Sequence, residues 1–497
     1  MNINIDKFPT VVENTIADIQ NLYLMDSVPW LIGCSWGKDS TCVLQLVWSA
    51  IAQLPSHRRH KSVTIITNDT KVENPYVQIY VESSIQQLNE AARKQNMPFQ
   101  AHLLSPPVKE RFWVKIIGAG YSRPTTRHRW CTPRLKINPS EKFIKDKISQ
   151  VGEAVMLLGV RKAESTNRAK NIAKHSKNEI LKNLTPSQTL PNCNIFTPIV
   201  DWSTQFVWMY LLQWKNPWRE DNRELFQLYR GATEDTECPL VIEKSTPNCG
   251  SSRFGCYTCT LVSREKSMEA MVYNDSEKEW LEPLLELHDM LAVENDRHRR
   301  EYSVINQKVR FHNLKIGDST ILEPTPGKYK QEWRIHFLKK LLEAQVKIQT
   351  TAPPQFKKLE LISNEELSEI RRIWIEEKAE IEDVLPKVYE EIIGKPYVEI
   401  NPTRAELHFL DLDVYESLVD STTNEKHLRL IAGLLNIEKE YSLKSNRSGI
   451  YKDLEKTINL RSKSDAKAIV DGYLKLKQQN SQLTLQFNNQ SSDPTKF

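Results

Sequence analysis

The sequence predicts an α/β protein in which a parallel-sheet core is followed by a cysteine-rich segment and a mainly helical C-terminal region. In residues 1–230, short apolar runs alternate with amphipathic stretches, which is the pattern of βα units. In residues 231–265 this pattern gives way to an irregular stretch that contains four cysteines. Residues 266–400 are long, charged and amphipathic, and residues 401–497 are a basic region that ends in a Gln/Asn/Ser-rich tail predicted to be disordered.

The composition indicates a globular, water-exposed protein. The chain has 497 residues, 39% of them hydrophobic and 26% charged, and its net charge of +5 is too small to identify a nucleic-acid-binding protein. No apolar run approaches the ~18 residues of a membrane helix, and the N-terminus lacks a signal-peptide pattern. We therefore expect a cytoplasmic location and no membrane contact. In that compartment the eight cysteines would stay reduced, as metal ligands or reactive thiols.

The predicted core elements follow from the apolar pattern. The expected strands cover residues 30–34, 62–67, 99–104, 155–160 and 196–200, and the expected core helices cover 40–52 and 75–95. Beyond the cysteines, helices are expected at 276–301 and 332–346.

A candidate phosphate-binding loop, GCSWGKDS, spans residues 33–40 between the first expected strand and helix. Its backbone N–H groups and the helix dipole would point at an anion, and Gly37 would allow close approach. Lys38 adds a positive charge, and the hydroxyls of Ser35 and Ser40 can donate to phosphate oxygens. The alternative is an ordinary strand–turn–helix junction.

This loop is not a Walker A motif. Only three residues separate Gly33 from Gly37, and Asp39 follows the lysine where Ser or Thr would be required. Asp39 could cap the helix or help to orient a metal ion, for which Mg²⁺ is the expected candidate.

Polar residues follow two other expected strands. Asp69 and Glu73 come after the second strand, where ligands of open α/β sheets bind, although a polar turn is an equally good interpretation. Arg161 and Arg168 come after the fourth strand and are suited to phosphate contacts, or else to ion pairs with Glu164 between them.

Cys131 lies in the acid-free basic segment 123–136. Positive neighbours lower the pKa of a thiol, so Cys131 is the first candidate for a sulfur relay, and a half-buried structural cysteine is the alternative. The same basic segment and the C-terminal region could neutralise nucleic-acid phosphates.

Four cysteines follow the core with the spacing C-x10-C-x6-C-x2-C: Cys238, Cys249, Cys256 and Cys259. Four thiolates select zinc or an iron–sulfur cluster over hard cations, and the spacing alone does not distinguish the two. The other thiols, Cys34, Cys42 and Cys193, are expected to include packing residues.

The core resembles the phosphoadenosine phosphosulfate reductase branch of the PP-loop ATP pyrophosphatases. The resemblance rests on SWGKDS, TNDTKVEN, RWCTPRLK, GVRKAESTNR and FTPIVDWSTQFVWMYL, which occur in the expected order between residues 30 and 215. It departs from the PP-loop pattern SGGKDS at Trp36, which replaces the first glycine of the pair.

This resemblance implies a Rossmann-like core that binds ATP and cleaves it between the α- and β-phosphates. It implies ATP-binding roles for Ser35, Gly37, Lys38, Asp39, Ser40, Asp69, Arg161 and Arg168, catalytic roles for Lys38, Asp39 and Cys131, and a [4Fe–4S] cluster rather than zinc on the four cysteines.

With the cysteine spacing and the long extension included, the chain resembles the DndC family of DNA phosphorothioation sulfurtransferases. The implied partners are DNA, a cysteine desulfurase as sulfur donor and the other proteins of the Dnd system. A reductase of adenylated sulfate is disfavoured, because such enzymes use a catalytic cysteine near the C-terminus and no cysteine follows Cys259 here. A tRNA-thiolating enzyme and a non-catalytic nucleotide-binding subunit remain as alternatives.

Overall fold

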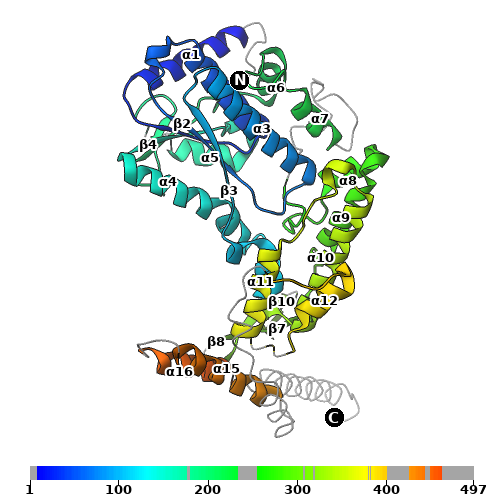
Figure 1. Cartoon of the computed structure of the whole chain (residues 1–497). Helices are drawn as coiled ribbons and strands as arrows, with labels where there is room; N and C mark the ends of the chain where they lie inside the picture. Colours follow the sequence, from blue (N-terminus) through cyan, green and yellow to red (C-terminus); the bar gives the residue numbers. More distant parts are fainter. Residues whose placement is uncertain are drawn as a thin grey trace, which may run out of the picture. The chain divides into compact units, whose positions relative to one another are not determined.

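A computed structural model of the chain describes residues 8–175, 179–232, 255–305, 308–316, 319–378, 380, 382–399, 425–442 and 448–461. The chain forms two compact units (Figure 1). Unit 1 comprises Met1–Phe112, Pro124–Ala292 and Lys347–Leu361, and unit 2 comprises Trp113–Arg123, Val293–Val346 and Ile362–Phe497. The domain boundaries that the sequence suggests near 230, 265 and 400 stay predictions.

Unit 1 is built on a six-stranded sheet with the order β3-β2-β1-β4-β6-β5. Five strands are parallel and β5 pairs antiparallel with β6. The predicted α/β class with a parallel central sheet is therefore confirmed. The strands are β1 Trp30–Gly33, β2 Val63–Asn68, β3 Phe99–Leu104, β4 Ala154–Leu158, β5 Leu184–Pro186 and β6 Cys193–Phe196.

Helices cover both faces of this sheet, so its strands are apolar on both sides. Successive residues of β1 point to opposite faces: Trp30 and Ile32 enter the larger core, and Leu31 enters the smaller one. The larger core contains side chains of α1, α2, α3, α6 and α7, and the smaller one contains Ile144 of α4. The helices of unit 1 are α1 Phe8–Leu24, α2 Lys38–Ala52, α3 Pro75–Lys94, α4 Asn138–Val151, α5 Thr166–His175, α6 Thr204–Gln213, α7 Arg223–Gly231, α8 Lys266–Asn274 and α9 Glu282–Leu291.

The last parallel strand differs from its prediction. It covers Cys193–Phe196, whereas the sequence suggested 196–200. Residues after Phe196 form turns instead, because the amide of Val200 bonds to the carbonyl of Thr197 and that of Trp202 to the carbonyl of Ile199. The apolar pattern of this segment therefore reflects buried turns.

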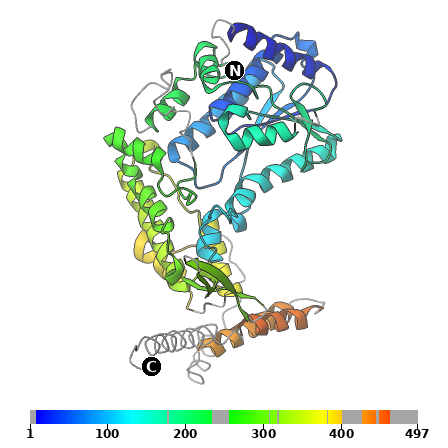
Figure 2. The same cartoon turned by 180° about the vertical axis from the view of Figure 1, so that it is seen from behind.

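Unit 2 combines helices with short antiparallel strands that the sequence analysis missed. The expected helix 276–301 ends at Leu291, and β7 begins at Arg300. Figure 2 shows the β10–β11 ribbon clearly, in green. The strands are β7 Arg300–Tyr302, β8 Val304–Ile305, β9 Lys308–Val309, β10 Phe311–Ile316, β11 Ser319–Pro324 and β12 Pro326–Tyr329. The helices are α10 Gln331–Thr351, whose last residues belong to unit 1, α11 Asn364–Arg372, α12 Val384–Ile393, α15 Glu425–Ser442 and α16 Ile450–Arg461.

A buried ion pair lies in the core of unit 2. Arg334 donates to both carboxylate oxygens of Glu380, and the two side chains are 2% and 6% exposed. The indole of Trp374 lies under the guanidinium and donates to the carbonyl of Ile117 at 2.9 Å. In neither unit do the described residues include a helix long and apolar enough to cross a bilayer.

Candidate nucleotide site and cysteine pair

The candidate site lies where the strand order changes direction. β2 and β3 lie on one side of β1, and β4, to which the chain returns, lies on the other side with β6 and β5 beyond it. Ligands of doubly wound sheets bind at this switch point, beyond the carboxyl ends of the strands. A cavity of about 490 Å³ occupies this position in unit 1. Its lining includes Ser35, Lys38 and Ser40 from the predicted loop, Asn68 and Glu73 after β2, Lys136 and Ser140 near α4, Glu164 after β4, and Leu225, Leu228 and Tyr229 from α7.

The loop leaves the N-terminus of α2 open to this cavity. Gly37 is the N-cap and supplies no capping side chain. The amide of Thr41 bonds to the carbonyl of Gly37, and the amide of Lys38 donates to the Tyr229 hydroxyl at 3.3 Å. Within the described part of the chain, the amides of Asp39 and Ser40 have no recorded acceptor. Such N–H groups, together with the helix dipole, form an anion-binding site.

Gly159 lets β4 approach this helix terminus. A Cβ at Gly159 would lie 2.8 Å from the carbonyl carbon and oxygen of Asp39 and 2.9 Å from the amide nitrogen of Ser40. These are backbone atoms, which cannot move aside as a side chain can. The glycine therefore fixes the spacing between the end of β4 and the loop.

The backbone conformation and burial of Trp36 explain how a tryptophan can stand where the SGGKDS pattern has a glycine. Its φ of 57° lies in the left-handed region, where glycine is favoured. Its side chain is 1% exposed, donates from Nε1 to the Thr67 hydroxyl at 2.9 Å and packs edge-on against Trp218. The indole thus occupies the core and leaves the backbone of the loop to line the cavity.

Asp39 and Arg161 form an ion pair beside the loop. The Nε of Arg161 donates to Oδ1 of Asp39 at 2.7 Å, and Lys38 lies 3.5 Å from Oδ2. The remaining guanidinium nitrogens of Arg161 bond to the carbonyl of Trp202 and the hydroxyl of Thr204. Arg161, which is 1% exposed, therefore orients Asp39 in this structure, and its predicted phosphate contact stays a prediction.

The described lining of the cavity includes neither Asp69 nor Arg168, both predicted to bind ATP. The carboxylate of Asp69 accepts from the amide of Lys71 at 2.8 Å and pairs with its ammonium group at 2.7 Å, so it stabilises the turn after β2. Arg168 belongs to α5, and its side chain lies outside the described residues. The ATP-binding roles of both residues stay predictions.

The Cys256–Cys259 pair is attached to the turn after β2, of which Glu73 lines the cavity. The amide of Tyr257 bonds to the carbonyl of Val72, and Cys256 forms an antiparallel bridge with Glu73. The thiol of Cys256 lies 3.4 Å from the hydroxyl of Thr70. The turn after β2 therefore carries both a wall of the cavity and the attachment of the cysteine pair.

Lys136 provides the positive charge near the cysteine pair. Its pKa is raised, first by Cys256 and also by Glu73, Cys259 and Cys131, although burial opposes the increase. Burial raises the pKa of Cys256 to about 11, and Lys136 acts in the opposite direction. The pKa of Glu73 is raised by burial, again against the effect of Lys136.

The expectation that cationic neighbours would lower the pKa of Cys131 is wrong. Burial raises this pKa, and the thiol of Cys259 contributes to the increase. Of the neighbouring cations, Arg134 pairs with Glu110 and Lys136 faces the thiols. Cys131 thus shares its electrostatic surroundings with Cys256 and Cys259. Its role in sulfur transfer stays a prediction.

The four-cysteine metal site can be tested only in part. Cys238 and Cys249 lie outside the described residues. Within the described ranges, no group of three or more His, Cys, Asp or Glu side chains is arranged to hold a metal ion. The half that is described fits a sulfur-ligated group, because Cys256 and Cys259 belong to one tight turn in which the amide of Cys259 bonds to the carbonyl of Cys256.

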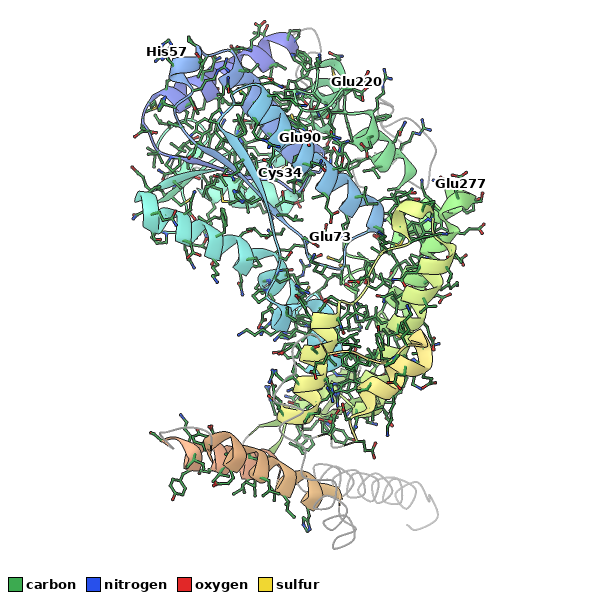
Figure 3. All side chains as sticks on the ribbon, viewed as in Figure 1. Cys34, His57, Glu73, Glu90, Glu220 and Glu277 are labelled. Atoms are coloured by element: carbon green, nitrogen blue, oxygen red, sulfur yellow. The ribbon has the colours of Figure 1, made fainter. Side chains whose placement is uncertain are left out.

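The thiols of the core are packing groups. Figure 3 labels Cys34 and Glu73, which come from the loops after β1 and β2. Burial raises the pKa of Cys34 to about 11, and it raises the pKa of Cys42 well above the usual range. Cys193 is also buried. None of these three thiols is suited to act as a thiolate near neutral pH.

Sequence reasoning missed several residues that line the cavity. Tyr229 and Lys136 are examples. Asn68 and Ser140 also line the cavity, and the side-chain amide of Asn68 donates to the hydroxyl of Ser140 at 2.7 Å. For Lys136 the available signal was its place in the basic segment. For Tyr229 there was none, since its contact with Lys38 spans 191 positions of the sequence.

Comparison with known proteins agrees with this architecture. Residues 30–262 match the family model of the phosphoadenosine phosphosulfate reductase domain, over slightly less than half of the chain. This segment is thus similar to that domain. An uncharacterized protein of Methanocaldococcus jannaschii is 28% identical over 207 residues, which cover 42% of this chain and 36% of that protein. The chain therefore spans about a third of the length of this curated relative.

Solved structures with local similarity include three enzymes. Phosphoadenylyl-sulfate reductase from Candida auris is 11% identical and covers 42% of this chain and 87% of its own, with a TM-score of 0.24. FMN adenylyltransferase from Candida glabrata is 12% identical (47% and 66%, TM-score 0.28). The U34-tRNA thiolase of Methanococcus maripaludis, solved with its [4Fe–4S] cluster, is 12% identical (57% and 80%, TM-score 0.27). Scores this low carry no functional argument.

Proposed function

We propose that this protein is an ATP-dependent sulfurtransferase that activates a DNA backbone phosphate by adenylation and helps to replace a non-bridging oxygen by sulfur. One observation carries the proposal: the cavity at the open, amide-rich terminus of α2 is also lined by Glu73, whose backbone is bridged to Cys256. A site for the pyrophosphate of ATP and a site for sulfur would then lie close together. The resemblance to the DndC family supports DNA as the substrate.

Each of the two sites would have its own task. The amides of Asp39 and Ser40, with Lys38 and the hydroxyls of Ser35 and Ser40, would hold the leaving pyrophosphate. An oxygen of the DNA phosphate would attack the α-phosphorus of ATP, and pyrophosphate would depart. A sulfur nucleophile would then attack the DNA phosphorus, and AMP would leave with the original oxygen.

The sulfur site would depend on the thiols. Cys256 and Cys259, with Cys238 and Cys249, would hold a [4Fe–4S] cluster or zinc, which would supply a binding place for sulfur. Lys136 would stabilise negative charge on sulfur there, since its electrostatic interaction with Cys256, Cys259 and Cys131 already raises its pKa. A cysteine desulfurase would supply the sulfur atom as a persulfide, a dithiol reductant would provide the two electrons that bring it to the sulfide level, and Mg²⁺ would accompany ATP.

Pyrophosphate release from ATP in the presence of DNA tests the first step. We expect Asp39→Asn to abolish this release while the protein stays folded and retains its metal. Asparagine is preferable to alanine here because it still accepts a hydrogen bond from the buried Arg161. Asp201→Asn, which alters an exposed ion pair with Lys162, is the matched control. Undiminished release by Asp39→Asn would contradict the assignment.

The substrate is tested in cells with and without the gene, with its genomic neighbours present. DNA and RNA are digested and searched for sulfur by mass spectrometry. We expect a phosphorothioate dinucleotide in DNA that disappears on deletion. Sulfur lost only from tRNA bases would identify a thiolase instead, and no change in either pool would overturn the sulfurtransferase assignment.

A further inference from the structure

Tyr229 occupies the mouth of the anion site in a way that the proposed chemistry does not require. It lies near the end of α7, which forms one wall of the cavity. Its hydroxyl accepts a hydrogen bond from the amide of Lys38, the first residue of α2. N–H groups in a first helical turn point outward along the helix axis, so their acceptor stands where an anion would bind.

The side chain of Lys38 makes a second contact with the same residue. Its ammonium nitrogen lies 5.2 Å from the centroid of the Tyr229 ring, within the range of a cation–π interaction. The amide and the ammonium with which Lys38 would hold a phosphate therefore both contact Tyr229, and the ammonium also lies 3.5 Å from Oδ2 of Asp39. The hydroxyl accepts from an amide to which a phosphate oxygen could bind, and the ring face lies near the ammonium.

Local packing supports this arrangement. A Cβ at Gly37 would lie 3.1 Å from the Tyr229 hydroxyl, so glycine at this position allows the close approach. The φ of Gly37 is −75°, which any residue can adopt, so backbone freedom does not explain the glycine. Trp208 packs edge-on against the tyrosine at 5.2 Å and helps to hold it in place.

The contact is also weak enough to exchange. The N···O distance of 3.3 Å is longer than the usual 2.9–3.0 Å of such hydrogen bonds. An anion with full negative charge makes a stronger bond to the same amide. The hydroxyl would therefore yield its position to phosphate.

We propose that Tyr229 competes with pyrophosphate for Lys38. In the ligand-free protein its hydroxyl accepts from the amide of Lys38 and its ring contacts the ammonium, and both contacts are displaced when the phosphates of ATP bind. This inference rests on the proposed function in that the loop must bind pyrophosphate. It assigns Tyr229 as a positioning residue that sets the affinity for the nucleotide.

Calorimetric titration of the full-length protein with inorganic pyrophosphate, and separately with ATP, tests the proposal. Tyr229→Phe removes the competing hydroxyl and keeps the ring over Lys38. We expect it to bind pyrophosphate more tightly, by about threefold to tenfold, the contribution of one ordinary hydrogen bond. Tyr210→Phe removes a hydroxyl from the same core outside the cavity and should leave the affinity unchanged.

Hydrogen exchange of the peptide that contains Lys38 provides a second measurement. In the absence of ligand, its amide should exchange faster in Tyr229→Phe than in the wild type, and saturating pyrophosphate should make the two proteins equal. Equal or weaker pyrophosphate binding by a folded Tyr229→Phe variant would overturn the role of Tyr229. A wild-type protein that binds neither pyrophosphate nor ATP would overturn the proposed function as well.

Discussion

At position 36 a tryptophan adopts the left-handed backbone conformation that glycine ordinarily provides. A non-glycine residue in this region carries a strain of about 1–2 kcal/mol. Burial of the indole and its bond to Thr67 offset this strain. The departure from the SGGKDS pattern therefore concerns the core beneath the loop, and the amides that face the cavity are retained.

Replacement of Trp36 by the glycine of the SGGKDS pattern should consequently destabilise the protein. Removal of a buried tryptophan costs about 3–5 kcal/mol, and relief of strain returns about 1–2 kcal/mol. We expect Trp36→Gly to lower the free energy of unfolding by about 2–3 kcal/mol, measured by denaturant unfolding of unit 1.

Asn96→Gly is the matched control for this change. Asn96 also has a positive φ, of 47°, but its side chain is exposed. Strain is relieved there without loss of a buried side chain, so the free energy of unfolding should change by less than about 1 kcal/mol. A stability gain in Trp36→Gly would show that the indole contributes little.

At the scale of elements, the site depends on the contact between the end of β4 and the start of α2. Gly159→Ala would place a methyl group against the backbone of Asp39 and Ser40. Because the backbone must shift, we expect an affinity for pyrophosphate lower by about tenfold or more and a stability loss of about 1–3 kcal/mol. Titration calorimetry and thermal unfolding measure the two effects.

Gly231→Ala serves as the control for this substitution. A Cβ there would meet only the flexible tip of Lys278, at 3.9 Å. Its affinity and stability should match the wild type. If Gly159→Ala also binds pyrophosphate normally, the spacing between β4 and α2 does not control the site.

The core elements were largely predictable because burial on both faces gives continuous apolar runs. The strand predicted at 99–104 is observed as Phe99–Leu104, and the helix predicted at 75–95 is observed as Pro75–Lys94. The strands between Arg300 and Tyr329 were missed because they are short and rich in charged residues, so their apolar alternation is weak. The charged pattern therefore predicts a helix that extends to residue 301, where the structure has a strand.

The site was predictable where it depends on one continuous segment. The loop from Gly33 to Ser40 lines the cavity, and its binding of phosphate stays a prediction. The pairing of Asp39 with Arg161, and the approach of Cys131 to Cys259, depend on how distant segments fold together. No local pattern contains that information, and the basic residues around Cys131 in fact gave the wrong direction for its pKa.

At the scale of the whole molecule, each unit has a core whose loss can be measured separately. In unit 2, Glu380→Gln would leave the buried charge of Arg334 without its counterion. We expect a loss of about 3–5 kcal/mol in the stability of unit 2. In calorimetry, Glu380→Gln should lower the midpoint temperature of one thermal transition. Pyrophosphate should raise the midpoint temperature of the other transition only.

Glu343→Gln, in an exposed pair with Lys340, is the control and should change stability by less than about 1 kcal/mol. Pyrophosphate binding should be the same in both variants and the wild type. A single transition that responds both to Glu380→Gln and to pyrophosphate would show that the units unfold together.

The attachment of the cysteine pair to the turn after β2 has a consequence for how the protein is assembled in the cell. The contacts of Tyr257 with Val72 and of Cys256 with Glu73 are made by the backbone, so they require no metal and no sulfur. Two of the four candidate ligands are then in place before any metal or sulfur arrives. Under the proposed function, a cofactor would therefore be delivered to a folded chain in which Cys256 and Cys259 are already positioned.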